Sequence, residues 1–182
     1  AHGALEIHPS AAAEVAQQAV FARYREMEPA ALMTDAEAMA TAGRLFRQNC
    51  AMCHGSDGRG ATGFPNLADG DWQWGGSHEQ VMETLANGRM AAMPAWAAAL
   101  GEDGLDEVVA YVLQMSGHGA DPQLAGAGEA RFQMFCVACH GADGKGNPML
   151  GAPNLTDGTW LYGGSAEDIE FALRNGRNGQ MP

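Results

Sequence analysis

The sequence predicts a mainly helical protein made of two small units in tandem. An internal repeat predicts the two units: "NCAMCHGSDGRG" at 49–60 returns 86 positions later as "FCVACHGADGKG" at 135–146. Amphipathic spacing predicts the helices, most clearly in "LDEVVAYVLQM" at 105–115, where apolar side chains recur every three or four residues. Units this small are rarely stable through side-chain packing alone, so we expect a bound group in the middle of each.

The chain divides into a connector, two domains and a short linker. A helix over 10–28, capped by Ser10, is expected in the connector. The second domain ends soon after the last match to the first, so we expect it to lack the helix that the first domain has at 105–115. The predicted segments are 1–34 for the connector, 35–117 for the first domain, 118–122 for the linker and 123–182 for the second domain.

Capping residues predict where the opening helix of each domain begins. Thr34 and Glu37 have the spacing of a capping box, at the start of the helix that ends next to Cys50. Asp121 and Pro122 form the N-cap and first helical position of the equivalent helix in the second domain.

The helix at 105–115 has no expected copy in the second domain, and this difference decides the packing that we predict. We expect helix 105–115 to pack against the helix that ends at Cys50 and to close the first unit. Leu124, Phe132 and Phe135 of the second domain would then lack a packing partner.

The repeat extends well beyond the cysteines. Its offset grows from 86 to 88 in the loop that follows them, where an insertion of two residues is easily accommodated. We interpret the whole pattern as a tandem duplication. The matching segments are Pro65-Asn66-Leu67 with Pro153-Asn154-Leu155, Trp72 with Trp160, Asn87-Gly88-Arg89 with Asn175-Gly176-Arg177, and Met93-Pro94 with Met181-Pro182.

The two Cys-x-x-Cys-His motifs contain every cysteine of the chain. A zinc site would need thiolates from both repeats and would leave both histidines unexplained. A thioredoxin-like redox pair requires a strand before it, whereas a helix is predicted here. The remaining interpretation is attachment of c-type haem, because two thiols one helical turn apart reach the two vinyl groups of the ring. We therefore expect two covalently bound haem c groups, held by Cys50 and Cys53 and by Cys136 and Cys139, with His54 and His140 as iron ligands.

The second axial ligand decides whether such an iron transfers electrons or binds a substrate. Of eleven methionines, only Met93 and Met181 recur at equivalent positions, each on a loop stiffened by the following proline. We expect each to bind the iron of its own repeat, which would raise the reduction potential. Met90 has no methionine counterpart. His78 is an alternative ligand without a histidine counterpart, so we expect it at the surface.

Further residues of the repeats are candidates for supporting each haem. A ligating imidazole needs an acceptor for its other nitrogen, and the carbonyl groups of Pro65 and Pro153 are the candidates. Buried haem propionates need hydrogen-bond donors, and two tryptophans and two arginines of the repeats are the candidates. For the tryptophans, plain core packing is the alternative role. These donor candidates are Trp72, Trp160, Arg89 and Arg177. Three further histidines do not recur in the repeats and are expected to be exposed to solvent: His2, His8 and His118.

The formal net charge of −12 is spread over the whole chain, with an acidic excess in 1–39, 40–117 and 118–182. This distribution argues against nucleic acid as a partner. It fits either the steering of a basic protein partner or solubility alone. No apolar run is long enough to cross a bilayer, so we expect a soluble chain or the soluble part of a longer one.

The segments "DGDWQWGGS", "NGRMAAMPAW", "LGAPNLTDGTWLYGGS" and "LRNGRNGQMP" carry a resemblance to a known family. Over residues 18–182 the chain resembles the periplasmic dihaem region of subunit III (CcoP or FixP) of cbb-type cytochrome c oxidases. The resemblance implies two class I cytochrome c domains on the periplasmic side of the bacterial inner membrane, with an N-terminal membrane anchor that this chain lacks. It also implies electron entry from a soluble donor cytochrome c and delivery to the other subunits of a membrane oxidase. The chain by itself would then be an electron-transfer subunit and not an enzyme.

Two other functions remain open at this point. One is a free periplasmic dihaem electron shuttle. The other is a dihaem peroxidase or the cytochrome subunit of a dehydrogenase, in which one iron would keep an exchangeable site. A methionine in each repeat argues against the peroxidase, and "TWLYGGS" argues for the oxidase.

Overall fold

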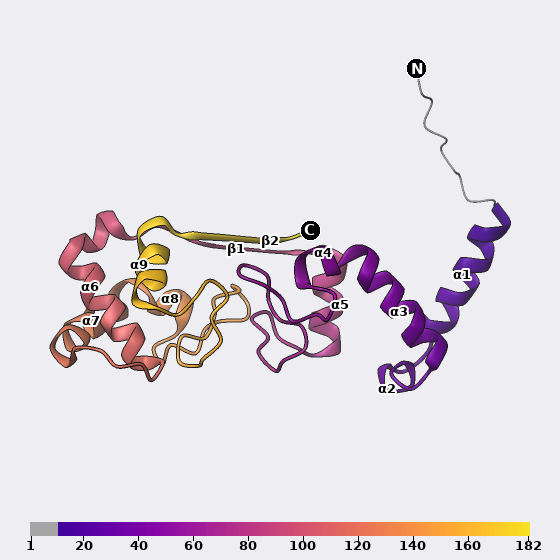
Figure 1. Ribbon diagram of the computed structural model, residues 1–182, viewed down its shortest axis with the longest axis horizontal. Helices are drawn as coiled ribbons and strands as arrows, with labels where there is room; N and C mark the ends of the chain where they lie inside the picture. Colours follow the sequence, from indigo (N-terminus) through magenta and orange to yellow (C-terminus); the bar gives the residue numbers. More distant parts are fainter. Residues whose placement is uncertain (1–10) are drawn as a thin grey trace, which may run out of the picture. The chain divides into compact units, whose positions relative to one another are not determined.

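The computed structural model describes the backbone of residues 11–182 and the side chains of residues 18–182. It divides into two compact units, Ala1–Met52 and Cys53–Pro182, and the boundary falls inside the first Cys-x-x-Cys-His motif. No helix among the described residues has the length and apolar character needed to cross a membrane. The elements are α1 (Ala11–Arg25), α2 (Pro29–Leu32), α3 (Ala36–Asn49), α4 (Ala51–His54), α5 (His78–Asn87), β1 (Arg89–Met93), α6 (Ala97–Met115), α7 (Pro122–Phe135), α8 (Val137–His140), α9 (Ala166–Asn175) and β2 (Arg177–Met181) (Figure 1).

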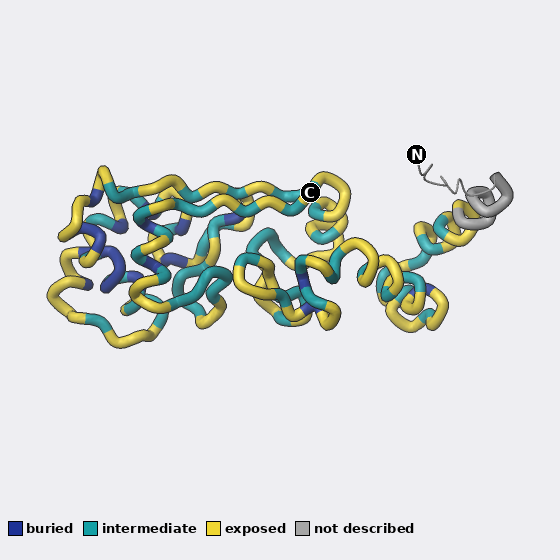
Figure 2. Tube along the Cα trace, turned by 45° about the horizontal axis from the view of Figure 1, so that its top comes forward, coloured by how far each residue is buried: buried dark blue, intermediate teal, exposed yellow. Residues whose placement is uncertain are grey.

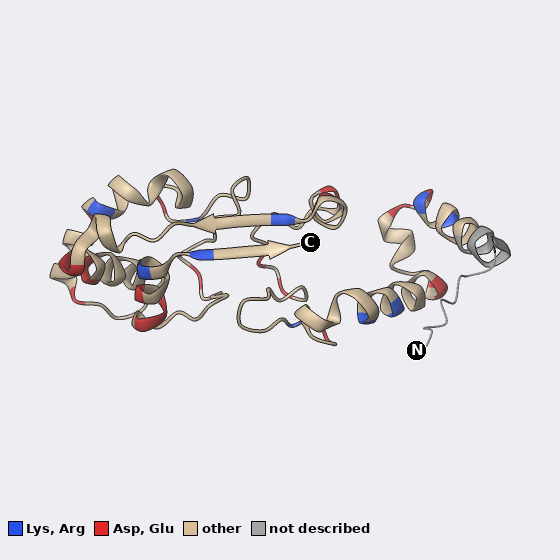
Figure 3. Cartoon of the chain, turned by 90° about the horizontal axis from the view of Figure 1, so that it is seen from above, with Lys and Arg blue, Asp and Glu red and all other residues tan. Residues whose placement is uncertain are grey.

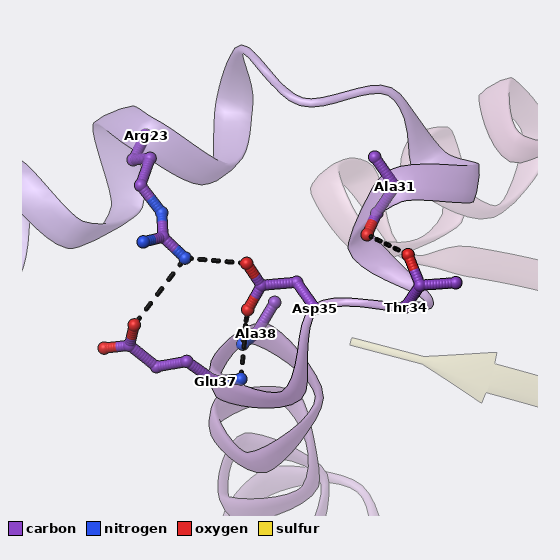
Figure 4. A network of polar contacts seen from close by, with 6 residues as sticks. All are labelled: Arg23, Ala31, Thr34, Asp35, Glu37 and Ala38. Carbon is purple, nitrogen blue, oxygen red and sulfur yellow. Dashed lines mark hydrogen bonds and ion pairs between the residues drawn. The ribbon is translucent and has the colours of Figure 1, made fainter.

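Helices α1, α2 and α3 make up the N-terminal unit. The expected connector helix is present as α1, while its predicted cap, Ser10, lies outside the described residues. The guanidinium group of Arg23 on α1 lies 2.9 Å from the carboxylate of Asp35 and 3.6 Å from that of Glu37 (Figure 4). This contact joins α1 to the start of α3.

The start of α3 differs from the predicted capping box. Asp35 is the N-cap, and its Oδ1 accepts hydrogen bonds from the backbone N–H groups of Glu37 and Ala38 (Figure 4). Thr34 instead donates its hydroxyl to the carbonyl of Ala31 at 3.0 Å. The prediction that Thr34 caps the helix is therefore wrong by one residue, because the Asp35 carboxylate accepts from the second and third helical N–H groups and its negative charge is favoured at a helix N-terminus.

The core of the C-terminal unit lies where α6, α7 and α9 meet, and Figure 2 shows buried segments gathered there. Leu105 and Val108 of α6 and Phe132 of α7 are at most 1 % exposed. The predicted helix 105–115 is present but begins earlier, at Ala97, and Gly101 breaks its regular geometry. The predicted start of α7 is confirmed, since Asp121 caps the helix and Pro122 follows it.

The expected partner of α6 is wrong. Its buried side chains form one cluster with Phe132 of α7 and with Ile169 and Leu173 of α9, so its apolar face is not available to the helix that ends at Cys50. Phe132 therefore has a packing partner, and Phe135 is half-buried, contrary to the prediction. Leu124, at the start of α7, is 40 % exposed.

Specific contacts hold α6 against α7. A side-chain carbon at Gly128 would lie 2.0 Å from the carbonyl oxygen of Glu107, so only glycine permits this crossing. The carboxylate of Glu107 accepts a hydrogen bond from Arg131. One turn further, the rings of Tyr111 and Phe132 lie 5.3 Å apart. Backbone, charge and aromatic contacts thus all favour the same pairing.

Strands β1 and β2 form a two-stranded antiparallel ladder that the sequence did not predict. In its register Arg89 lies opposite Met181, and Met93 lies opposite Arg177. Figures 1 and 3 show the strands running side by side, with a basic residue at the start of each. Met93 therefore ends a strand and does not sit on the expected loop.

Loops of the two repeats also meet within the C-terminal unit. The N–H of Gly63 donates to the carbonyl of Leu161 at 2.8 Å, and the side chain of Gln73 donates to the carbonyl of Gly151. The hydroxyl of Thr159 donates to Asp71, its own counterpart 88 positions earlier, at 2.6 Å. Gly63 corresponds to Gly151 and Gln73 to Leu161, so the first two contacts join the same pair of positions with the repeats exchanged, as contacts do across the two-fold axis of a symmetric dimer.

Candidate functional site

The two histidines of the repeated motifs are held in the same way. His54 ends α4 and His140 ends α8, and their residues are 7 % and 8 % exposed. Nδ1 of His54 lies 2.9 Å from the carbonyl oxygen of Pro65, and Nδ1 of His140 lies 3.0 Å from that of Pro153. The two hydrogen bonds predicted from the sequence are therefore present, while their role beside an iron stays a prediction.

These hydrogen bonds decide which imidazole nitrogen is free. A carbonyl oxygen can only accept, so Nδ1 must carry the hydrogen in both residues, and the neutral ring then has its lone pair on Nε2. Burial lowers the pKa of His140, an effect that the hydrogen bond to Pro153 partly offsets. The neutral imidazole with a free Nε2 is the form that binds a metal.

The cysteines precede the histidines at the ends of equivalent helices. The backbone N–H of Cys50 bonds to the carbonyl of Phe46, and that of Cys136 bonds to Phe132. Cys53 is half-buried, whereas Cys139 is exposed. Burial, with a smaller contribution from Cys139, raises the pKa of the Cys136 thiol to about 11.

Two predicted haem-supporting side chains of the second repeat have buried donors without acceptors. Nε1 of Trp160 and Nε of Arg177 find no hydrogen-bond partner among the described residues. A buried donor left without a partner costs about 1–3 kcal/mol, so both atoms indicate an acceptor that the described residues do not supply. A carboxylate, such as a haem propionate, would satisfy them.

The corresponding side chains of the first repeat are placed differently. Trp72 is 37 % exposed, so its indole N–H is not forced to find a protein partner. Arg89 donates through Nε to the hydroxyl of Thr84 at 2.9 Å and through a terminal nitrogen to the carbonyl of Gln80 at 3.4 Å. Among the described residues, therefore, only the second repeat has buried donors without acceptors at these positions.

Sequence reasoning missed a pair of aromatic residues beside the arginines. The guanidinium carbon of Arg89 lies 5.0 Å from the ring centre of Trp74, and that of Arg177 lies 4.5 Å from that of Tyr162. Both distances are typical of cation–π contacts. Trp74 and Tyr162 are 88 positions apart, so the repeat itself contained the signal that would have found them.

The predicted sulfur ligands both end strands of the ladder and are both half-buried. Met90, by contrast, is 76 % exposed. His78 is exposed at the start of α5, as expected, and so is His118, whose Nδ1 lies 2.9 Å from the hydroxyl of Ser116. His2 and His8 lie outside the described residues.

The donor set of the repeats fits a covalently bound haem. Each supplies two thiols, a buried imidazole with a free Nε2, and a thioether on a strand. Trp160 and Arg177 add two buried donors that lack acceptors among the described residues. In such a group the thiols would bond to the vinyl groups, the imidazole and thioether would be available to the iron, and the unused donors would suit its carboxylates.

Comparison with known proteins identifies the same architecture. The sequence profile of the family "Cytochrome C oxidase, cbb3-type, subunit III" matches residues 37–112 and again residues 123–182. The two matches confirm the predicted fold class of tandem cytochrome c domains.

Several curated proteins are similar over most of the chain. The subunit CcoP of the cbb3-type cytochrome c oxidase of Rubrivivax gelatinosus is 44% identical over 164 residues, which is 90% of this chain and 54% of that protein. CcoP of Rhodobacter capsulatus is 46% identical over 150 residues, 76% of this chain and 50% of that protein. FixP of Bradyrhizobium diazoefficiens is 44% identical over 171 residues, 86% of this chain and 57% of that protein. The chain spans about half the length of these curated relatives.

Proposed function

The chain belongs to the family of cbb3-type cytochrome c oxidase subunit III, and we propose that it passes single electrons through two haem c groups toward a haem–copper oxidase. The observation that carries the proposal is the repeated hydrogen bond of a buried histidine Nδ1 to a proline carbonyl, at 2.9 Å and 3.0 Å. This bond makes Nδ1 the nitrogen that carries the hydrogen in each repeat, so the neutral ring offers the lone pair of Nε2, which is the arrangement that an iron ligand needs.

The chain's own residues hold and tune the two groups. Cys50 and Cys53 would attach the first haem, and Cys136 and Cys139 the second. Met93 and Met181 would supply the sixth ligands. A thioether opposite an imidazole raises the reduction potential and leaves no exchangeable position, which favours electron transfer over catalysis. A bound haem contributes the reversible change between ferric and ferrous iron.

The second repeat is also built to bind carboxylates of the ring. Trp160 and Arg177 would donate to the propionates, and the rings of Tyr162 and Phe171, which lie 4.5 Å and 4.8 Å from the guanidinium carbon, would hold that side chain in place. In the first repeat Trp72 and Arg89 would make weaker contacts, because the indole is exposed and the guanidinium already has partners. We expect the second haem to be held more firmly at its propionate edge.

Partners and location follow from the family and from charge. The relatives are named as subunits of cbb3-type oxidases, so we propose that this chain assembles with such an oxidase on the periplasmic side of the inner membrane. Attachment there would use a membrane anchor that precedes these residues. The net charge of −12 would attract a basic donor cytochrome c and raise its rate of association.

Two experiments test the proposal. Extraction of the purified protein with acidified acetone should leave the colour with the polypeptide, because thioether bonds survive it; recovery of the haem in the solvent would contradict covalent attachment. Addition of the reduced protein to a cbb3-type oxidase depleted of its own subunit III should restore oxygen uptake. Covalent haem without restored uptake would support a free electron shuttle instead.

A further inference from the structure

Trp74 of the first repeat and Tyr162 of the second each reach into the other repeat. A side-chain carbon at Gly151 would overlap the indole ring of Trp74, and one at Gly63 would lie 3.5 Å from Cε1 of Tyr162. Gly63 and Gly151 are themselves 88 positions apart, as are Trp74 and Tyr162. The structure therefore makes the same aromatic contact twice, with the repeats exchanged.

The two glycines belong to loops that also orient the histidines. Each loop is closed by an isolated antiparallel bridge, and a proline follows directly. The bridges pair Ala61 with Phe64 and Asn147 with Ala152. The carbonyl oxygen of Pro65 then lies 2.9 Å from Nδ1 of His54. That of Pro153 lies 3.0 Å from Nδ1 of His140. Each aromatic ring thus packs two residues before the carbonyl group that holds the histidine of the other repeat.

The residue before each ring holds the same loop through a hydrogen bond. The carbonyl of Leu161 accepts from the N–H of Gly63 at 2.8 Å. The side chain of Gln73 donates to the carbonyl of Gly151. Each loop is therefore fixed by two consecutive residues of the other repeat, one through a polar group and one through its ring.

Both rings are half-buried, and each has an arginine of its own repeat as a neighbour. The guanidinium carbon of Arg89 lies 5.0 Å from the ring centre of Trp74, and that of Arg177 lies 4.5 Å from that of Tyr162. A side-chain carbon at Gly179 on β2 would lie 3.7 Å from the hydroxyl of Tyr162. Close-packed groups transmit displacement to their neighbours, so the position of each ring bears on the loop that it touches.

We propose that Trp74 and Tyr162 are positioning residues, each for the histidine of the other repeat. Tyr162 fixes the loop that orients His54, and Trp74 fixes the loop that orients His140. The proposal rests on the proposed function, because it affects electron transfer only if both histidines bind iron. The hydrogen bond at Nδ1 sets how strongly a ligating imidazole donates electrons, and such bonds tune the reduction potential. Each repeat thereby influences the potential of the haem in the other.

Loss of a ring should act with a definite sign. When the loop is freed, the hydrogen bond from Nδ1 to the proline carbonyl weakens. The imidazole then donates less charge, which favours ferrous over ferric iron and raises the reduction potential. A role in packing alone would lower stability without selecting one histidine.

Nuclear magnetic resonance of the dihaem protein, with histidine labelled by ¹⁵N, can observe the two Nδ1–H groups separately. Hydrogen exchange in the reduced protein measures how well each bond is held. During oxidation each signal moves when its own iron becomes paramagnetic, so the same signals give both potentials. Trp74→Leu and Tyr162→Leu are the test variants. Tyr111→Leu is the matched control, because that ring packs on Phe132 in the core.

We expect Trp74→Leu to speed exchange at His140 by about tenfold, the factor that corresponds to one lost hydrogen bond. The potential of the second haem should rise, while His54 stays unchanged. Tyr162→Leu should give the mirror result at His54 and the first haem. Trp74→Phe and Tyr162→Phe should largely keep the natural behaviour, since a ring remains, and Tyr111→Leu should alter neither histidine.

If Trp74→Leu does not fold, Gln73→Leu tests the same loop through its hydrogen bond and should also act on His140. An effect carried by Arg89 would instead fall on the first haem. A change at the histidine of the variant's own repeat, at both equally or at neither would overturn the crossed positioning while leaving the proposed function intact. Histidine signals that do not move on oxidation would overturn iron ligation, and the positioning with it.

Discussion

The carbonyl oxygen of Glu107 on α6 lies where a side-chain carbon at Gly128 on α7 would have to be, at 2.0 Å. Gly128→Ala should therefore force the two helices apart. We expect the free energy of unfolding of the haem-bearing protein to fall by about 1–3 kcal/mol or more, the usual cost of overpacking. Urea unfolding followed by circular dichroism measures this loss.

The equivalent position of α3 provides the matched control. Ala42 already has the methyl group, and it is exposed. Ala42→Gly should cost only the helix propensity of one residue, about 1 kcal/mol. If Gly128→Ala is as stable as the natural chain, the crossing of α6 and α7 is not as the structure has it.

An ion pair between α6 and α9 should make stability depend on pH. Arg174 donates to Glu102 at 3.0 Å and 2.5 Å, and this contact lowers the pKa of the Glu102 carboxyl below its ordinary value of 4.5. A carboxyl with a lowered pKa stabilises the folded state above its unfolded pKa, and this contribution is lost as the pH falls through the folded pKa. Glu102→Gln should therefore destabilise the protein near pH 7 and have little effect near pH 3.

Denaturant unfolding at the two pH values tests this sign. Glu83→Gln is a suitable control, since Glu83 is exposed on α5 and makes no ion pair among the described residues. The Glu102 side chain is 77 % exposed, so salt should weaken the effect of Glu102→Gln. An equal loss at both pH values would mean that the side chain acts through packing and not through its charge.

The sequence predicted the parts of the fold that depend on local spacing or on the repeat. The caps at Asp121 and Pro122 and the contacts of His54 and His140 with proline carbonyls follow from residues close together in the chain. These features needed no knowledge of which helices meet.

The pairing of helices was missed because it depends on comparing α3 with α7. Sequence order favoured α3 as the partner of α6, whereas the glycine at 128 and the arginine at 131 favour α7. The ladder was missed because β1 and β2 are short, rich in Ala, Gly and Met, and stabilised only by each other. Register between distant segments cannot be read from either strand alone.

The two thiols of the second motif should react at different rates in protein prepared without haem. Cys139 is exposed, whereas burial raises the pKa of Cys136 to about 11. Because the thiolate is the reactive form, we expect Cys136 to be alkylated on the order of a hundredfold more slowly near pH 8. Timed iodoacetamide labelling with peptide mass spectrometry measures both rates. If the ratio of the two alkylation rates is the same in the folded chain as in urea, Cys136 is not shielded.

Because the indole N–H of Trp160 is an unused donor, the effect of Trp160→Phe on stability should change sign when haem binds. Without haem, Trp160→Phe removes a buried N–H that has no acceptor among the described residues, so the variant should be as stable as the natural chain or more stable. With haem, the same change should cost about 1.5–3 kcal/mol, because a charged propionate loses a donor. Thermal unfolding of both forms measures the two effects, and Trp72→Phe is the control, since Trp72 is 37 % exposed. A similar loss in both forms would indicate that Trp160 serves only in packing.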